Sequence, residues 1–439
     1  MPSRLLALAP LLLLSLAVPA SAVAEGYAAG EVLVRYENGA GAAAAADVER
    51  LTGIETEETL PGGTERVAIE DGDSVQETLA QLRSDPRVAY AVPNWRVRAA
   101  ALIPNDPGRR LQWNLFEPFG IGMPEAWELA AARGAPGGRG AVVAVLDSGV
   151  AYERFGRFRR APDLRARTFT RGYDFVDDDR HPNDEHGHGT HVAGTIAQAT
   201  NNRLGTAGIA YGAKIMPLRV LDSVGRGYVF AVARAIRYAA RRGADVINLS
   251  LDFHPSVRAA HIPDVLSAIR YARRRRAVLT AAAGNEGELP VLYPARAPGV
   301  IAVGATTHTG CQAYYSSTGS ELDVMAPGGG EDAANTLSQW DRDRCNPDAF
   351  GRAIIQQTFA KPRSVSRFAL RGPRYLGTSM ASGHVAAVAA LVIATGRLGP
   401  EPAPELVEQH LEATARDAGA PGFDHVYGHG LIDAAAALR

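Results

Sequence analysis

Residues 140–150 read GAVVAVLDSGV, a nearly continuous apolar run that stops at Asp147. Similar runs recur downstream as AKIMPLRVLD, ADVINLSL, AVLTAAAGN and GVIAVGAT, with helical stretches such as YVFAVARAIRYAARRG between them. Strands that are apolar throughout are buried on both faces, and their alternation with helices is typical of a parallel sheet. From about residue 111 the sequence therefore predicts an α/β fold, a parallel sheet flanked by helices, with ligands expected where the strands end.

The charges of the whole chain are balanced. Its 439 residues carry 46 basic and 47 acidic side chains, a formal net charge of -1. This balance gives no general attraction to nucleic acid or anionic membrane, so neither is expected as a partner. Arginines cluster at 273–276 and at 154–171. Binding of a polyanion is one interpretation of them, and neutralisation of helix ends is the favoured one.

Residues 1–22 are expected to be a secretory signal peptide. Arg4 precedes an apolar run, and Ala20 and Ala22 form an A-x-A cleavage site. A membrane anchor is the alternative, but the run is shorter than the roughly 20 residues needed to span a bilayer. The protein is thus expected to be secreted, extracellular or periplasmic. In an exported chain, Cys311 and Cys345 permit one disulfide, which we expect over two unpaired thiols.

A small domain follows the signal. GEVLVRY, TERVAIED and VAYAVPNWRVR read as strands, while AAAADVERLTG and DSVQETLAQLRSDPR read as helices, the second capped by Asp73 or Ser74. This order, with room for one more strand, predicts a small α+β ferredoxin-like domain. The segment AALIPNDPGRR, with its two prolines, then reads as an exposed linker.

Residues 186–195, HGHGTHVAGT, carry three histidines whose spacing allows two kinds of chemistry. His186, His188 and His191 could hold a zinc ion through their imidazoles, or one of them could act as a general base. A separate acid and a separate hydroxyl favour the second: Asp147 ends a strand, and Ser379 in GTSMAS starts a probable helix. Asn285 ends AAAGN in the same way. Each of these is weak evidence alone, since such residues commonly form turns and helix caps.

Together these motifs resemble the subtilisin family of serine peptidases. The resemblance rests on VLDSG, HGTHVAGT, NNRLGTAGIA, DVINLSL, AAAGNEG, VIAVGA, LDVMAPG and GTSMAS, and it extends from about Gln112 to the end of the chain. It implies a secreted serine endopeptidase that works through an acyl-enzyme, with Asp147, His188 and Ser379 in the family's chain order. Asn285 would then stabilise the oxyanion. His191 is expected to pack inside the fold and His186 to lie in a loop.

The resemblance also implies a self-processed zymogen. Residues 23–104 would be a propeptide that assists folding and inhibits the enzyme, and residues 105–439 the peptidase domain. Autocleavage is expected between Val97 and Asp106. The expected partners are protein or peptide substrates and the chain's own propeptide, with a monomeric enzyme. Two alternatives are a catalytically silent peptide-binding scaffold and a zinc-dependent hydrolase.

Further site residues are expected from the same resemblance. Residues that would bind substrate are Gly225, Arg226, Gly227, Ser250, Leu251, Asp252, Ala283 and Gly284. Relatives carry Ser-Leu-Gly-Gly where this chain has 250–253. An aspartate there could favour a basic substrate side chain or could point to solvent.

Calcium is expected as a structural cofactor, with none needed for the chemistry. One site would use Asp174, Asp177, Asp179 and Asn183 with the carbonyl of His181, and its alternative is a solvated acidic turn. A second would combine Asp163, Asn202, the carbonyls of Leu204 and Thr206, and Gln112.

Overall fold

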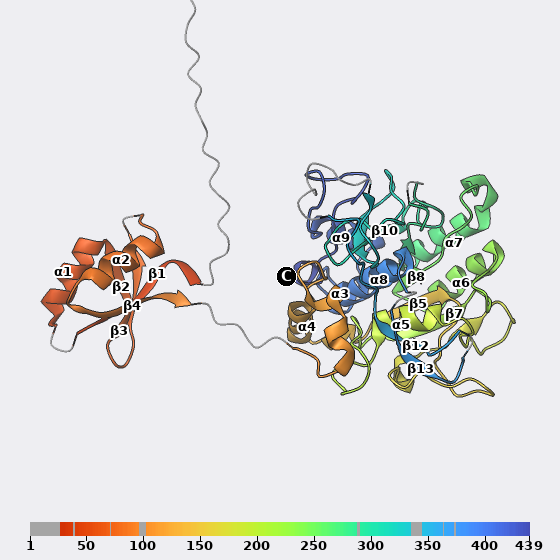
Figure 1. Cartoon of the computed structure of the whole chain (residues 1–439), viewed down its shortest axis with the longest axis horizontal. Helices are drawn as coiled ribbons and strands as arrows, with labels where there is room; N and C mark the ends of the chain where they lie inside the picture. Colours follow the sequence, from red (N-terminus) through yellow and green to blue (C-terminus); the bar gives the residue numbers. More distant parts are fainter. Residues whose placement is uncertain are drawn as a thin grey trace, which may run out of the picture. The chain divides into compact units, whose positions relative to one another are not determined.

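The computed structural model describes residues 27–37, 40–70, 72–95, 102–287, 290–334, 345–362, 364–372 and 375–439. The chain divides into two compact units, residues 1–100 and 101–439 (Figure 1). The predicted signal peptide and Val97, at one end of the predicted cleavage segment, lie outside the described residues.

The first unit is a four-stranded antiparallel sheet with two helices, in the strand order β2-β3-β1-β4. Along the chain its elements are β1 (Tyr27–Tyr36), α1 (Ala42–Thr52), β2 (Ile54–Thr59), β3 (Thr64–Ile69), α2 (Val75–Ser84) and β4 (Val88–Trp95). This is the predicted ferredoxin-like arrangement, and β2 is the strand for which the sequence left room. Ser74 caps α2 and forms a capping box with Glu77, because each side chain binds the other residue's backbone amide.

The second unit contains a seven-stranded parallel sheet in the order β11-β10-β9-β8-β5-β7-β6. Its strands are β5 (Val142–Asp147), β6 (Tyr173–Asp174), β7 (Lys214–Arg219), β8 (Val246–Leu249), β9 (Val278–Ala282), β10 (Ile301–Thr306) and β11 (Val324–Pro327). The central strands are almost entirely buried, which explains their unbroken apolar runs. The predicted α/β class is confirmed.

Alternate side chains of each strand enter two separate cores, one on each face of the sheet. Val143 and Val145 pack with α4 (Met123–Ala132), α5 (His188–Ala197), α8 (Thr378–Ala394), α9 (Pro404–Ala413) and α10 (Ala434–Leu438). Ala144 and Leu146 pack with α6 (Val229–Arg241) and α7 (Pro263–Arg274). In Figure 1, α8 lies at the centre of this unit, where it is buried over nearly its whole length. The sheet therefore fixes the start of α8 near the ends of its central strands.

The unit also contains a short helix, α3 (Trp113–Phe116), and a two-stranded hairpin of β12 (Gln356–Phe359) and β13 (Phe368–Arg371). Its 3-10 turns lie at Pro107–Leu111, Pro136–Gly138, Ala166–Thr168 and Ala259–His261. Cys311 and Cys345 form the expected disulfide. Among the described helices, none has both the length and the apolar character required to cross a bilayer.

Candidate active site

The acid and the imidazole meet at the carboxyl end of β5. Asp147 is fully buried, and its Oδ1 and Oδ2 lie 2.8 and 2.9 Å from Nδ1 of His188, the first residue of α5. Burial lowers the pKa of His188, but the charge and hydrogen bond of Asp147, with the charge of Asp184, raise it above its ordinary value. The pair therefore favours an imidazolium with a fixed ring orientation.

The backbone around this pair is held by Asp184, which the sequence analysis did not single out. Asp184 is fully buried, and its two oxygens accept hydrogen bonds from the amides of His186, Gly187 and Thr190. It also accepts hydrogen bonds from the hydroxyls of Ser148 and Thr190. The acid thereby satisfies free amides at the start of α5 and joins that helix to the end of β5.

Ser379 lies in the first turn of α8 and is 9% exposed. Its hydroxyl donates to the carbonyl of Ser250 at 3.2 Å, while the Ser250 hydroxyl donates to the carbonyl of Ser379 at 2.8 Å. The start of a long helix leaves backbone amides free and carries a partial positive charge. The serine is thus placed where negative charge is stabilised, beside a strand end that also faces the cavity.

Asn285 follows β9 and is held by one end of its side-chain amide. Its Oδ1 accepts hydrogen bonds from the amide and the hydroxyl of Thr378, at 2.9 and 3.1 Å. Among the described residues, no partner is recorded for its Nδ2. Because the oxygen is fixed, the amide nitrogen is available as a donor to a bound molecule.

A cavity of about 880 Å³ brings these residues together. His188, Asn285 and Ser379 line it, and so do six of the expected substrate residues, namely Gly225, Arg226, Gly227, Ser250, Leu251 and Asp252. Ala283 and Gly284, the other two, are buried and are not part of its lining. Asp222 shapes one wall, since its carboxylate accepts hydrogen bonds from the amides of Val224 and Arg226.

The three histidines do not form one ligand set. His191 is buried, its Nε2 lies 3.0 Å from the carbonyl of Ile354, and its ring stacks on Tyr375. Burial and the charge of His188 lower the pKa of His191 to about 3, so it stays neutral. His186 is exposed in the loop before α5. No group of metal-binding side chains found among the described residues contains any of the three.

Asp163 lies at the centre of one expected calcium site. It is fully buried and accepts hydrogen bonds from Asn202 Nδ2 at 2.7 Å and from the amide of Thr206. The side-chain amide of Gln112 binds the backbone of Ala207 through both of its ends. The buried carboxylate of Asp106 accepts hydrogen bonds from the amides of Asn201 and Asn202, and its charge acts on Asp163. Burial and the charge of Asp106 raise the pKa of Asp163 to about 6.

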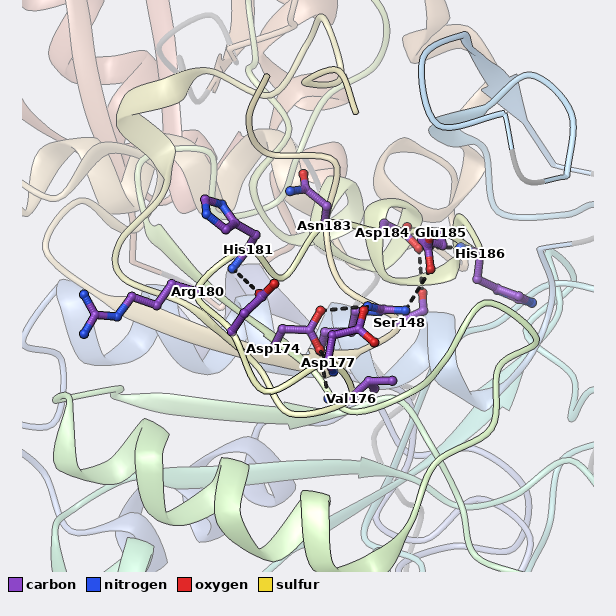
Figure 2. Close-up of polar contacts among 12 residues, drawn as sticks. Ser148, Asp174, Val176, Asp177, Arg180, His181, Asn183, Asp184, Glu185 and His186 are labelled. Carbon is purple, nitrogen blue, oxygen red and sulfur yellow. Dashed lines mark hydrogen bonds and ion pairs between the residues drawn. The ribbon is translucent and has the colours of Figure 1, made fainter. Parts of the chain in front are cut away.

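The second expected site contains an arginine. Arg219 is 4% exposed, and its guanidinium contacts Asp174 Oδ2 at 2.7 Å, Asp177 Oδ2 at 2.5 Å and Glu185 Oε2 at 2.9 Å. Figure 2 shows Asp174 and Asp177 side by side, with the side chains of His181 and Asn183 directed away from them. A cation would therefore share two carboxylates with a buried guanidinium.

Comparison with known proteins identifies the family. Residues 138–430 match the subtilase family, and residues 16–94 match the fervidolysin N-terminal prodomain, a match that begins within the predicted signal. A thermophilic serine proteinase of Bacillus sp. (strain AK1) is 33% identical over 92% of this chain and 86% of its own length. Thermitase of Thermoactinomyces vulgaris is 36% identical over 67% of this chain and 86% of its own length. A solved structure of proteases from Pseudoalteromonas arctica PAMC 21717 is 33% identical, with a TM-score of 0.62, and the match covers 76% of this chain and 98% of that one.

The chain belongs to the subtilase family. It is a serine endopeptidase with an N-terminal prodomain.

Proposed function

We propose that Asp147, His188 and Ser379 are the catalytic triad of this peptidase and that Asn285 stabilises the oxyanion. One observation carries the proposal: a half-buried His188 bonded to the buried Asp147, a serine at a helix start and a free amide donor meet at one cavity. A catalytically silent peptide-binding scaffold would not require an acid–imidazole pair, a serine and an amide donor at the same cavity. A zinc hydrolase is disfavoured, since His191 is turned into the core.

The reaction begins with a change of partner for the Ser379 hydroxyl. In the structure this hydroxyl donates to Ser250, so it must rotate about its side chain to reach Nε2 of His188, a change between staggered rotamers. His188 then takes the hydroxyl proton as the oxygen attacks the substrate carbonyl. Asp147 holds the imidazolium through Nδ1. The tetrahedral intermediate breaks down when His188 returns the proton to the leaving amine, and water hydrolyses the acyl-enzyme by the same steps.

The developing oxyanion is expected to bind Asn285 Nδ2 and the backbone amide of Ser379. The Asn285 donor is already oriented by Thr378, so its alignment costs no reorganisation during the reaction. Substrate would lie along Gly225, Arg226 and Gly227 as an added strand. At 227 a Cβ atom would approach the carbonyl of Val220 at 2.2 Å, so a side chain there would push this loop out of place.

Residues 1–22 are proposed to direct export, 23–104 to act as the propeptide and 105–439 to form the mature enzyme. The prodomain match supports a propeptide role for the first unit. Cleavage by the enzyme itself would fall between Val97 and Asp106. The mature enzyme is proposed to act as a secreted monomer, either extracellular or in the periplasm.

Calcium is proposed as a structural ion. Asp163 and Asp106 are buried carboxylates that repel one another, and no positively charged side chain pairs with either among the described residues. Oxygen ligands suit a hard cation, so these acids would hold calcium with Asn202 and the carbonyls of Leu204 and Thr206. The Asp174, Asp177, Asp179, His181 and Asn183 set is retained as a weaker second site, because Arg219 already neutralises two of its acids.

Covalent labelling tests the nucleophile. The full chain is treated with phenylmethylsulfonyl fluoride, and intact mass, peptide mapping and casein hydrolysis are measured. We expect one sulfonyl group per chain, located on Ser379, and a parallel loss of activity. Two results would overturn the proposal. One is that treated enzyme keeps full activity and Ser379 carries no label. The other is that activity depends on bound zinc, whose content is measured directly.

A further inference from the structure

A second cavity, of about 810 Å³, shares no lining residue with the cavity that holds Ser379. Residues of the segment 152–180 and the end of α6 line it. Five of its lining residues are arginines, namely Arg154, Arg160, Arg171, Arg180 and Arg242. In a chain whose formal net charge is -1, this is a marked local excess of positive charge.

The five arginines of this cavity form no ion pairs within the part of the chain that the structure describes. None of the five guanidiniums has a carboxylate within ion-pair distance among the described residues. Glu153 is the only acid in the lining, and its Oε1 is already bound by His181 Nδ1 and Asn183 Nδ2, both at 2.8 Å. Arginines elsewhere, such as Arg219 and Arg273, do have acidic partners.

Helix ends account for only one of these arginines. Arg242 directly follows α6, where the negative end of the helix dipole favours a cation. Arg154, Arg160, Arg171 and Arg180 lie outside helices and strands. Figure 2 shows the side chain of Arg180 extending away from the carboxylates of Asp174 and Asp177. The guanidinium of Arg242 also lies over the ring of Tyr238, at 5.3 Å from its centroid. Neither helix capping nor charge pairing accounts for the other four arginines of the cavity.

The floor of the cavity is aromatic and firmly held. Tyr152 packs edge-on against Phe169 at 5.6 Å between ring centroids, and Tyr173 packs against Tyr238 at 5.7 Å. The Tyr152 hydroxyl donates to the carbonyl of Arg180, and the Tyr238 hydroxyl donates to the carbonyl of Gly172. These contacts join residue 152 to residue 180 and residue 172 to α6, so they hold the backbone next to the exposed side chains of Arg171 and Arg180.

We propose that this cavity binds a multivalent phosphate or sulfate anion. The planar guanidinium donates two parallel hydrogen bonds to such oxyanions, and arginine is the side chain best suited to them. The volume of about 810 Å³ is larger than one phosphate group needs. Because the guanidiniums come from four chain segments, they favour a ligand that carries several anionic groups. This site is independent of the proposed peptidase mechanism.

Calorimetric titration of the full-length Ser379→Ala chain tests the proposal, because this variant is expected to remain whole. Inorganic tripolyphosphate and sucrose octasulfate are the two probes, and sodium chloride of matched ionic strength is the blank. Saturable binding of either probe, weakened as salt rises, is expected. Binding of one probe and not the other shows which of the two anions the cavity prefers.

The decisive comparison uses two double variants with the same change of charge. Arg154→Gln with Arg171→Gln removes two cavity arginines and is expected to weaken binding at least tenfold. Arg110→Gln with Arg133→Gln removes two exposed arginines outside the cavity and is expected to leave the affinity within about twofold. Circular dichroism checks that both fold. Equal affinities of the two folded variants, or no binding beyond the salt blank, would overturn the proposal.

Discussion

Both carboxylate oxygens of Asp147 lie within 2.9 Å of Nδ1 of His188, and this contact fixes which imidazole nitrogen faces the cavity. A proton bound at Nδ1 leaves Nε2 free to accept the proton of Ser379. The contact of His188 with the buried Asp147 thus sets both the tautomer of the imidazole and the direction of proton transfer.

Asp147→Asn is expected to lower kcat by about 10⁴-fold, because the amide favours the wrong tautomer and does not stabilise the imidazolium. The acid limb of the kcat/KM profile should also move to lower pH. Activity needs neutral His188, and the variant removes the charge that raises its pKa. Rates on a fluorogenic peptide across pH measure both effects, with Asp348→Asn, an exposed acid, as the control. If the acid limb does not move, the charge of Asp147 does not influence the pKa of His188.

Asn285→Ala and Asn285→Asp together distinguish two roles of Asn285. One is the hydrogen bond that its Nδ2 would donate to the oxyanion, and the other is the hydrogen bond that its Oδ1 accepts from Thr378. The aspartate keeps an oxygen for the amide of Thr378 but loses the NH donor. We expect both variants to lose about 10²- to 10³-fold in kcat with little change in KM. Recovery of activity in Asn285→Asp would instead assign the residue a structural role.

Asp252 is expected to favour substrates with a basic side chain before the cleaved bond. It is exposed in the wall of the cavity that contains Ser379, and no ion pair to it is recorded among the described residues. Asp252→Asn should lower the ratio of kcat/KM for arginine over phenylalanine substrates by about two- to fivefold, the scale of an exposed ion pair. Asp264→Asn, an exposed acid in α7, is the control. An unchanged ratio would mean that Asp252 only faces solvent.

Removal of calcium should make the stability of the protein depend on pH. Without a cation, the pKa of Asp163 is raised from 3.8 to about 6, so its protonated form favours folding below pH 4 and this stability is lost between pH 4 and 6. The loss is about 3 kcal/mol. Melting curves with EGTA should show this decline, and calcium should restore the melting temperature. Asp163→Asn should remove most of the calcium response, because the site around Asp174 is the weaker one. An undiminished response would place the ion away from Asp163.

The sequence predicted the strand ends and helix starts that carry Asp147, His188 and Ser379, because buried parallel strands have a clear apolar pattern. It did not predict Asp106, which binds the amides of Asn201 and Asn202 about 95 residues away. The family resemblance suggested Gln112 instead, but both ends of its side-chain amide bind the backbone of Ala207.

Arg219 was missed for a similar reason. The register of β6 with β7 places Asp174 opposite Arg219, and β6 has only two residues, too few for any periodicity to reveal the pairing. The acidic loop therefore read as a metal site, although a buried guanidinium meets two of its acids.

The most direct test compares residues 23–439 as wild type and as Ser379→Ala, by intact mass and casein hydrolysis. We expect the wild type to lose its first unit by cleavage between Val97 and Asp106 and to digest casein, while the variant stays whole and inactive. Casein digestion by Ser379→Ala, or removal of the first unit in both proteins, would contradict the assignment of Ser379 as the nucleophile that matures its own chain.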